Sequence, residues 1–239
     1  ARQRIAEHHL RILRYYRFQT RFGAALDEEA EEACAALAHT LKGLSRERIA
    51  AELLALLALP DPHPTIARMR ARGVLSVILP EACPPQIAAL GRLIEAEAAQ
   101  GIAPDPVRRL AALLPPMPDV AETVAARLRL SKVQRGRLVA AAERRPEDAA
   151  SPRALAYRLT PAIATDRLLL TGGDAGALAG WEAPIFPLKG GAIVARGVTA
   201  GPAVARILQS VEARWVAEGF PEAARIEAIL SEELARAAP

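Results

Sequence analysis

The chain has 239 residues and a formal net charge of +4, with 51% hydrophobic and 24% charged residues. This composition excludes an intrinsically disordered protein and predicts one large or two small globular domains. The chain has no run of about 18 apolar residues and no signal peptide, so we expect a cytoplasmic protein in which Cys34 and Cys83 are reduced thiols.

The residue bias favours helix throughout. Alanine, leucine and arginine dominate, aromatic residues make up only 4%, and no segment alternates with the period of a strand. We therefore predict an all-α fold. The helices expected in chain order are residues 3–22, 27–43, 46–59, 65–72, 85–100, 105–114, 119–129, 131–144, 151–157, 160–170, a short helix after 191, a long helix from 202 to 219, and 221–236.

A glycine-rich stretch at residues 172–180, followed by two prolines, marks a boundary in this helical array. We expect two or three stacked helical subdomains. Their predicted ranges are 1–43, 44–171 and 172–239.

The positive charge is concentrated at the start of the chain. Residues 1–23 contain six arginines and one acid, Glu7. Subtracting these from 31 basic and 27 acidic residues leaves 25 and 26, so the rest of the chain is nearly neutral. This distribution predicts a local site for an anion.

The arginines share one face of the first predicted helix. At about 100° per residue, a stripe about 100° wide faces away from the apolar side. Its members are Arg4, Glu7, Arg11, Arg14, Phe18 and Arg21. From charge alone two interpretations stay open: a site for phosphates or base edges, or a solvated face that pairs with acids of the second helix.

The residue order in this helix resembles a known motif. Residues 4–23 read RIAEHHLRILRYYRFQTRFG, which is similar to the EDxxRxxR neck motif of class II tRNA nucleotidyltransferases, the family of CCA-adding enzymes and bacterial poly(A) polymerases. The resemblance implies a protein template for CTP or ATP formed by Glu7, His8, Arg11 and Arg14. His8 stands where the family has Asp. Because a neutral imidazole has one acceptor, we expect weakened selection for C and A, or an inactive enzyme.

Other segments extend the resemblance, in its alphaproteobacterial form, over most of the chain. They are LSRERIAAEL (44–53), GVL (73–75), ILPE (78–81), RLRLS (127–131) and FPLKGG (186–191). The family's helical body and tail hold the tRNA backbone. The resemblance therefore implies tRNA as a partner, with Arg46, Arg48 and Lys189 as candidate contacts.

The resemblance also implies a part that this sequence does not contain. The family binds Mg²⁺ through a DxD motif in an N-terminal nucleotidyltransferase head, and no DxD occurs here. We expect this chain to be the portion that follows such a head, with no catalytic or metal-binding residue of its own. The alternatives are a non-catalytic RNA-binding helical module and a scaffold for protein partners.

Several charged pairs carry no motif. The dipeptides Arg108–Arg109 and Arg144–Arg145 are typical of solvated helix surfaces, and we expect them there. Trp181 and Trp215 are expected in a core or an interface.

Overall fold

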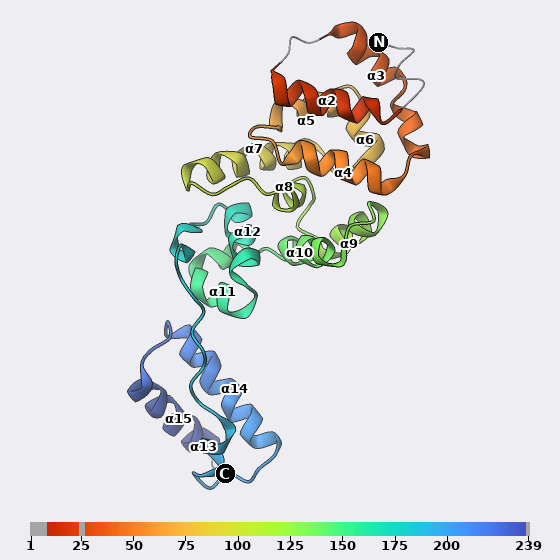
Figure 1. Cartoon of the computed structure of the whole chain (residues 1–239). Coiled ribbons are helices and arrows are strands. Elements are labelled where there is room, and N and C mark those ends of the chain that lie inside the picture. Colours follow the sequence, from red (N-terminus) through yellow and green to blue (C-terminus); the bar gives the residue numbers. More distant parts are fainter. Residues whose placement is uncertain (1–8, 24–26, 238–239) are drawn as a thin grey trace. The chain divides into compact units, whose positions relative to one another are not determined.

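The computed structural model describes residues 9–23 and 27–237, and in these ranges every regular element is a helix (Figure 1). The predicted all-α fold is confirmed. The chain forms two compact units: unit 1 contains Ala1–Ala150 and Thr165–Gly176, and unit 2 contains Ser151–Ala164 and Ala177–Pro239. None of the helices in the described ranges has both the length and the apolar character that a membrane span requires. The finer division at residues 43 and 171 remains a prediction.

The first part of unit 1 follows the predicted order closely, with one additional helix, α6 (Val74–Ile78), that was not among the predicted ones. Its elements are α2 (Arg11–Phe22), α3 (Glu28–Ala36), the 3₁₀ helix η1 (Ala38–Gly43), α4 (Arg46–Leu57), α5 (His63–Ala71) and α6. Helix α2 packs on α4 and on α5. It ends at Gly23, whose φ of 58° lies in the left-handed region and whose N–H donates to the Gln19 carbonyl at 3.0 Å.

The prediction of one helix over residues 27–43 is wrong, because the α-helix stops at Leu37 and continues as η1. Two side chains approach carbonyls of the last α-helical turn. The Thr40 hydroxyl donates to the Leu37 carbonyl at 2.6 Å, and His39 Nδ1 lies 3.2 Å from the Ala36 carbonyl. Such local side-chain bonds compete with the regular helical ladder.

The remaining elements of unit 1 also lie near their predicted positions, except for the short 3₁₀ helix η2 (Pro146–Ala150), which was not among the predicted helices. They are α7 (Pro84–Ala99), α8 (Pro106–Ala112), α9 (Pro118–Arg127), α10 (Lys132–Ala142) and η2, with α12 (Pro161–Thr171) contributing residues to both units. Asp105 caps α8 by accepting the N–H groups of Val107 and Arg108. Ser131 and Gln134 form a reciprocal capping box at α10.

A buried ion-pair network joins α7 and α8. Glu97 accepts a 2.8 Å hydrogen bond from Nε of Arg108 through one oxygen and another from Nε of Arg109 through the other. Arg109 also donates to the carbonyls of Leu57, Leu59 and Pro60, so it ties this network to the end of α4. The expectation that Arg108 and Arg109 lie on a solvated surface is therefore wrong. Both are buried, which requires paired charges.

A second cluster brings together two aspartates that are distant in sequence. Arg137 of α10 donates to both oxygens of Asp166 at 2.6 and 2.8 Å, and to Asp105 at 2.8 Å. Arg108 Nη1 lies 3.6 Å from Asp166. These contacts make Asp105 and Asp166 structural partners of arginines within unit 1.

Unit 2 is a smaller helical assembly with its own core. Its elements are α11 (Pro152–Arg158), η3 (Gly176–Leu178), which begins at the last residue of unit 1, α13 (Gly190–Val194), α14 (Pro202–Ala217) and α15 (Ala223–Ala237). Trp215 is buried, and its indole N–H donates to the Pro221 carbonyl at 2.9 Å. Tyr157 and Phe220 pack on its ring, and the partly buried Trp181 lies against Phe220. Core placement is thus confirmed for Trp215.

Candidate nucleotide and RNA interface

Helix α2 separates an apolar face from a basic one. Ile12, Leu13 and Tyr16 form the apolar face and are buried in unit 1. Arg14 lies on the other side with its side chain 51% exposed. Because the buried face fixes the rotation of the helix, the opposite face of α2 is presented outward.

Glu52 of α4 organises two of the arginines on α2. The Nε of Arg17 donates to one Glu52 oxygen at 2.7 Å, and the Nε of Arg14 lies 3.6 Å from the other oxygen. The Glu52 side chain is only 14% exposed, so this acid is shielded more than a surface carboxylate. The acid that pairs with these two arginines thus comes from α4. Glu31 lies on α3, the second predicted helix, and pairs with Arg68 and Arg72 instead.

A hydroxyl pair anchors the C-terminal part of α2. The Thr20 hydroxyl donates to the Thr65 hydroxyl of α5 at 2.7 Å, and it also lies 3.0 Å from the Tyr16 carbonyl. Together with the contact to Glu52, this bond joins α2 to two other helices of unit 1. The arginines therefore project from a helix that is fixed along its length.

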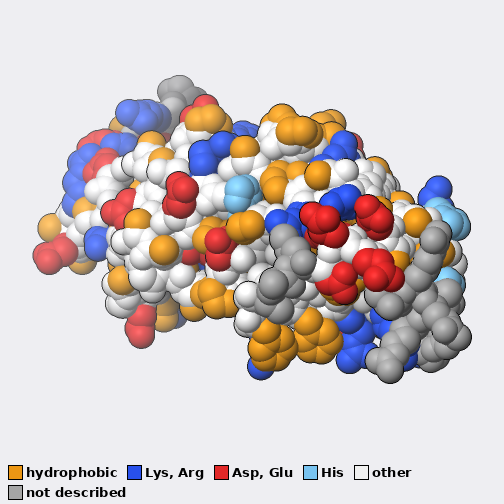
Figure 2. All heavy atoms as spheres, turned by 90° about the horizontal axis from the view of Figure 1, so that it is seen from above, with side chains coloured by type: hydrophobic (Ala, Val, Ile, Leu, Met, Phe, Trp, Pro, Cys, Tyr) orange, Lys and Arg blue, Asp and Glu red, His pale blue; other side chains and the backbone are white. Residues whose placement is uncertain are grey.

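Two aromatic rings accompany the arginines. Phe18 and Phe22 are 42% and 68% exposed, and their rings stack with centroids 5.9 Å apart. The guanidinium of Arg17 lies 4.9 Å from the Phe18 centroid, and that of Arg21 lies 5.7 Å from the Phe22 centroid. In the space-filling view, hydrophobic side chains stand on the surface beside Lys and Arg side chains (Figure 2).

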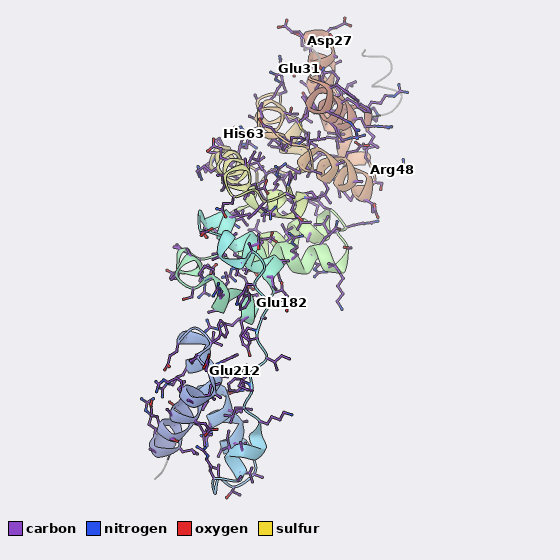
Figure 3. All side chains as sticks on the ribbon, turned by 60° about the vertical axis from the view of Figure 1, so that its left-hand side comes forward. Asp27, Glu31, Arg48, His63, Glu182 and Glu212 are labelled. Atoms are coloured by element: carbon purple, nitrogen blue, oxygen red, sulfur yellow. The ribbon has the colours of Figure 1, made fainter. Side chains whose placement is uncertain are left out.

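The start of α4 carries two further predicted residues. Arg48 is exposed and projects from α4 at the edge of unit 1 (Figure 3), and Arg46 lies within 3.4 Å of the Lys42 carbonyl. Between them, Glu47 accepts from the Ser45 hydroxyl and from Arg129. These two hydrogen bonds, that from Ser45 first, lower the pKa of Glu47 to about 2.

The predicted residues do not all belong to one described unit. Glu7 and His8 lie outside the described residues. Lys189 is exposed at the start of α13 and belongs to unit 2, whereas Arg11, Arg14, Arg46 and Arg48 belong to unit 1. Sequence reasoning missed Glu52, although its place in the LSRERIAAEL segment was visible.

The described residues do not fit a metal site. No group of three or more His, Cys, Asp or Glu side chains among them could hold a metal ion. Asp105 and Asp166, which the fold brings near each other, are both occupied by Arg137. We therefore assign no metal-dependent step to these residues.

Comparison with known proteins adds independent information. A protein-family model described as the probable RNA and SrmB-binding site of polymerase A matches residues 23–84. Mitochondrial CCA tRNA nucleotidyltransferase 1 of Mus musculus is 30% identical, in an alignment that covers 92% of this chain. The chain is thus similar, over nearly all of its length, to a CCA tRNA nucleotidyltransferase. It spans 54% of the length of this mouse relative.

Solved CCA-adding enzymes share the fold. A CCA-adding enzyme in complex with ATP matches 100% of this chain and 62% of its own length, with a TM-score of 0.71 and 18% identity. The Thermotoga maritima CCA-adding enzyme complexed with tRNA-CCA gives the same TM-score and identity over 63% of its length. At this identity the likeness establishes the arrangement of helices and no more.

Proposed function

We propose that this chain is the C-terminal, base-selecting and RNA-binding portion of a tRNA nucleotidyltransferase that adds CCA, or A alone, to tRNA 3′ ends from CTP and ATP. The observation that carries this proposal is the fixed set of arginines on α2, in a chain that is similar to a CCA tRNA nucleotidyltransferase. Helix α2 offers guanidinium donors on one face and a buried anchor on the other. Such donors match the acceptors on a base edge or a phosphate.

In this proposal Arg11 and Arg14 donate hydrogen bonds to the base of the incoming nucleotide, and Glu7 and His8 complete the template. The exocyclic amine shared by cytosine and adenine needs an acceptor. A neutral His8 has one acceptor nitrogen, and a protonated His8 has none. The identity of residue 8 therefore limits how well the template separates C and A from other bases.

Glu52 acts in this proposal as a positioning residue. A free arginine side chain loses about 2 kcal/mol of rotamer entropy when it is held in one geometry. The 2.7 Å hydrogen bond to Arg17 and the 3.6 Å contact with Arg14 restrict these side chains before the nucleotide binds, so less rotamer entropy is lost on binding. Glu52 thus orients the arginines without touching the base.

The RNA is held by helices after α2. The match of residues 23–84 to an RNA-binding family model supports this assignment, and Arg46 and Arg48 lie within that range. Lys189 is the candidate contact in unit 2. Double-helical RNA is recognised mostly by shape and backbone, which suits scattered cations on a rigid helical surface.

The catalytic metal belongs, in this proposal, to a separate nucleotidyltransferase head. Mg²⁺ held there by carboxylates would activate the RNA 3′-hydroxyl and steady the leaving pyrophosphate. This chain contributes base selection and RNA binding only. We place the complete enzyme in a reducing compartment, the cytoplasm, because Cys34 and Cys83 are both unpaired.

One observation favours a second function. His8 replaces the acid that base selection needs, which fits a non-catalytic RNA-binding module. The two functions separate in an assay of the complete enzyme with Mg²⁺, CTP, ATP and a tRNA that lacks its 3′ CCA. We expect ordered addition of C, C and A, with fewer errors in a His8→Asp variant.

Matched variants make the assay specific. Arg14→Lys keeps the charge but loses the planar fork, so nucleotide selection should fall, whereas Arg92→Lys on the exposed side of α7 should change nothing. If neither the natural protein nor His8→Asp extends the tRNA, while this chain still binds tRNA in a salt-dependent way, the non-catalytic module is the correct function.

A further inference from the structure

The two exposed rings on α2 are unusual within this chain. The sequence contains four phenylalanines. Phe186 and Phe220 pack against the core of unit 2, but Phe18 and Phe22 stand on the surface, stacked on each other. Burying a large ring is favourable, so an exposed aromatic pair on one helical face indicates a surface that binds something.

The charges around the rings indicate the nature of the ligand. Described α2 contains four arginines and no acid. Arg17 is neutralised by Glu52, but Arg21, which lies over the Phe22 ring, makes no ion pair with any described residue. A flat apolar ring beside an uncompensated guanidinium is complementary to a nucleotide, because the base can stack while the phosphate meets the arginine.

The position of the rings relates them to the proposed template. At 100° per residue, Phe18 and Phe22 lie within about 20° of the direction of Arg11. At 1.5 Å per residue they lie about 10 and 16 Å further along the helix axis. Stacked nucleotides rise about 3.4 Å each, so the rings are about three to five nucleotides from a base held at Arg11.

We propose that Phe18 and Phe22 form a stacking platform for unpaired bases near the 3′ end of the RNA, with Arg21 contacting a phosphate. This inference rests on the proposed function and names a binding surface for the RNA end. A purely apolar protein partner would cover the rings but leave the Arg21 charge without a counterpart. An unpaired RNA end satisfies both features.

The test uses this 239-residue chain and a tRNA transcript that ends before CCA and carries 2-aminopurine as its last base. Stacking on the platform should quench the 2-aminopurine fluorescence on binding. Replacing an aromatic that stacks on a base costs about 1–3 kcal/mol, or about 5- to 150-fold in affinity. We expect a loss in that range for Phe22→Ala and a further loss for the double variant with Phe18→Ala, whereas Phe22→Trp should retain affinity and quenching.

Three controls make the result specific. Val133→Ala shortens another exposed apolar side chain, on α10, and it should leave binding unchanged. A blunt-ended RNA duplex offers no unpaired base, so it should not distinguish Phe22→Ala from the natural chain. Arg21→Gln should reduce the slope of log affinity against log salt by about one phosphate contact.

The outcomes separate this inference from the proposed function. If the natural chain binds the tRNA in a salt-dependent way but both Phe variants bind equally well without loss of quenching, the platform is refuted and the RNA-binding role stands. If the natural chain does not bind RNA, both are refuted. Circular dichroism of each variant must match the natural chain, as expected for substitutions at exposed positions.

Discussion

Because Glu97 pairs with two buried arginines, we expect the substitution Glu97→Gln to lower the free energy of unfolding substantially. In Glu97→Gln the shape is kept, but Arg108 and Arg109 lose the carboxylate that each contacts at 2.8 Å. All three side chains are at most 4% exposed, so solvent cannot replace the lost charge. Breaking a buried pair by removing one partner typically costs about 3–5 kcal/mol, because it leaves an uncompensated buried charge.

The remaining contacts place the effect at the lower end of that range. Arg108 keeps Asp166 at 3.6 Å, and Arg109 keeps three carbonyl acceptors at the end of α4. The negative end of the helix dipole favours a cation there. We therefore expect Glu97→Gln to lower the free energy of unfolding by about 3 kcal/mol, or the melting temperature by about 6–12 °C for a unit of this size.

Urea titration followed by far-ultraviolet circular dichroism measures this change. Glu95→Gln, on the exposed side of the same helix, is the matched control and should stay within about 0.5 kcal/mol of the natural chain. Adding Arg109→Met to Glu97→Gln should recover part of the loss, because it removes an orphaned charge. A shift for Glu97→Gln no larger than that of Glu95→Gln would refute the reasoning.

Three further predictions concern other parts of unit 1. Glu52→Gln in the complete enzyme should lower kcat/KM for CTP relative to GTP without weakening tRNA binding, because it frees Arg14 of the proposed template, together with Arg17, and removes a negative charge; nucleotide-specific kinetics measure this. Gly23→Ala should destabilise the chain by about 1–2 kcal/mol because its φ is 58°, whereas Gly43→Ala, at an ordinary φ, should cost less in the same urea titration. Burial, and secondarily Glu31, raises the pKa of the Cys34 thiol to about 12, so at pH 8 a thiol reagent should modify Cys83 alone until the chain is unfolded. The folded state favours the protonated Cys34 thiol, so its contribution to stability should be lost as the pH rises from about 9 towards 12.

The sequence was sufficient to predict most of the helices, because their signals are local. Apolar spacing, prolines at helix starts and glycines at helix ends act within a few residues. Gly23 ends α2 and Ser131 caps α10 as such signals require. The break at Leu37 was missed because the residue pattern there is compatible with a continuous α-helix, whereas in the structure the N–H and the hydroxyl of Thr40 both donate to the Leu37 carbonyl.

The charged contacts were much less predictable than the helices. Arg108 and Arg109 read as surface residues, since nothing local distinguishes a buried arginine from a solvated one. Their burial depends on Glu97, 11 and 12 residues earlier, and on carbonyls about 50 residues earlier. Likewise, the link between Arg17 and Glu52 spans 35 residues. Which charges meet is decided by packing, which a pattern along one helix does not contain.

This dependence on packing bears on how a protein can read a base. Discrimination by hydrogen bonds requires donors held to within about half an ångström, because a loosely held donor satisfies the wrong base almost as well as the right one. A solvated helix with four arginines cannot meet this requirement on its own. In this chain the buried face of α2 fixes the helix, Thr20 is joined to Thr65, and Glu52 restrains Arg17 and approaches Arg14. If the chain has the proposed function, the motif provides the hydrogen-bond donors and the following helices hold them in place, so base selection should be sensitive to substitutions in α4 and α5 that never touch the nucleotide.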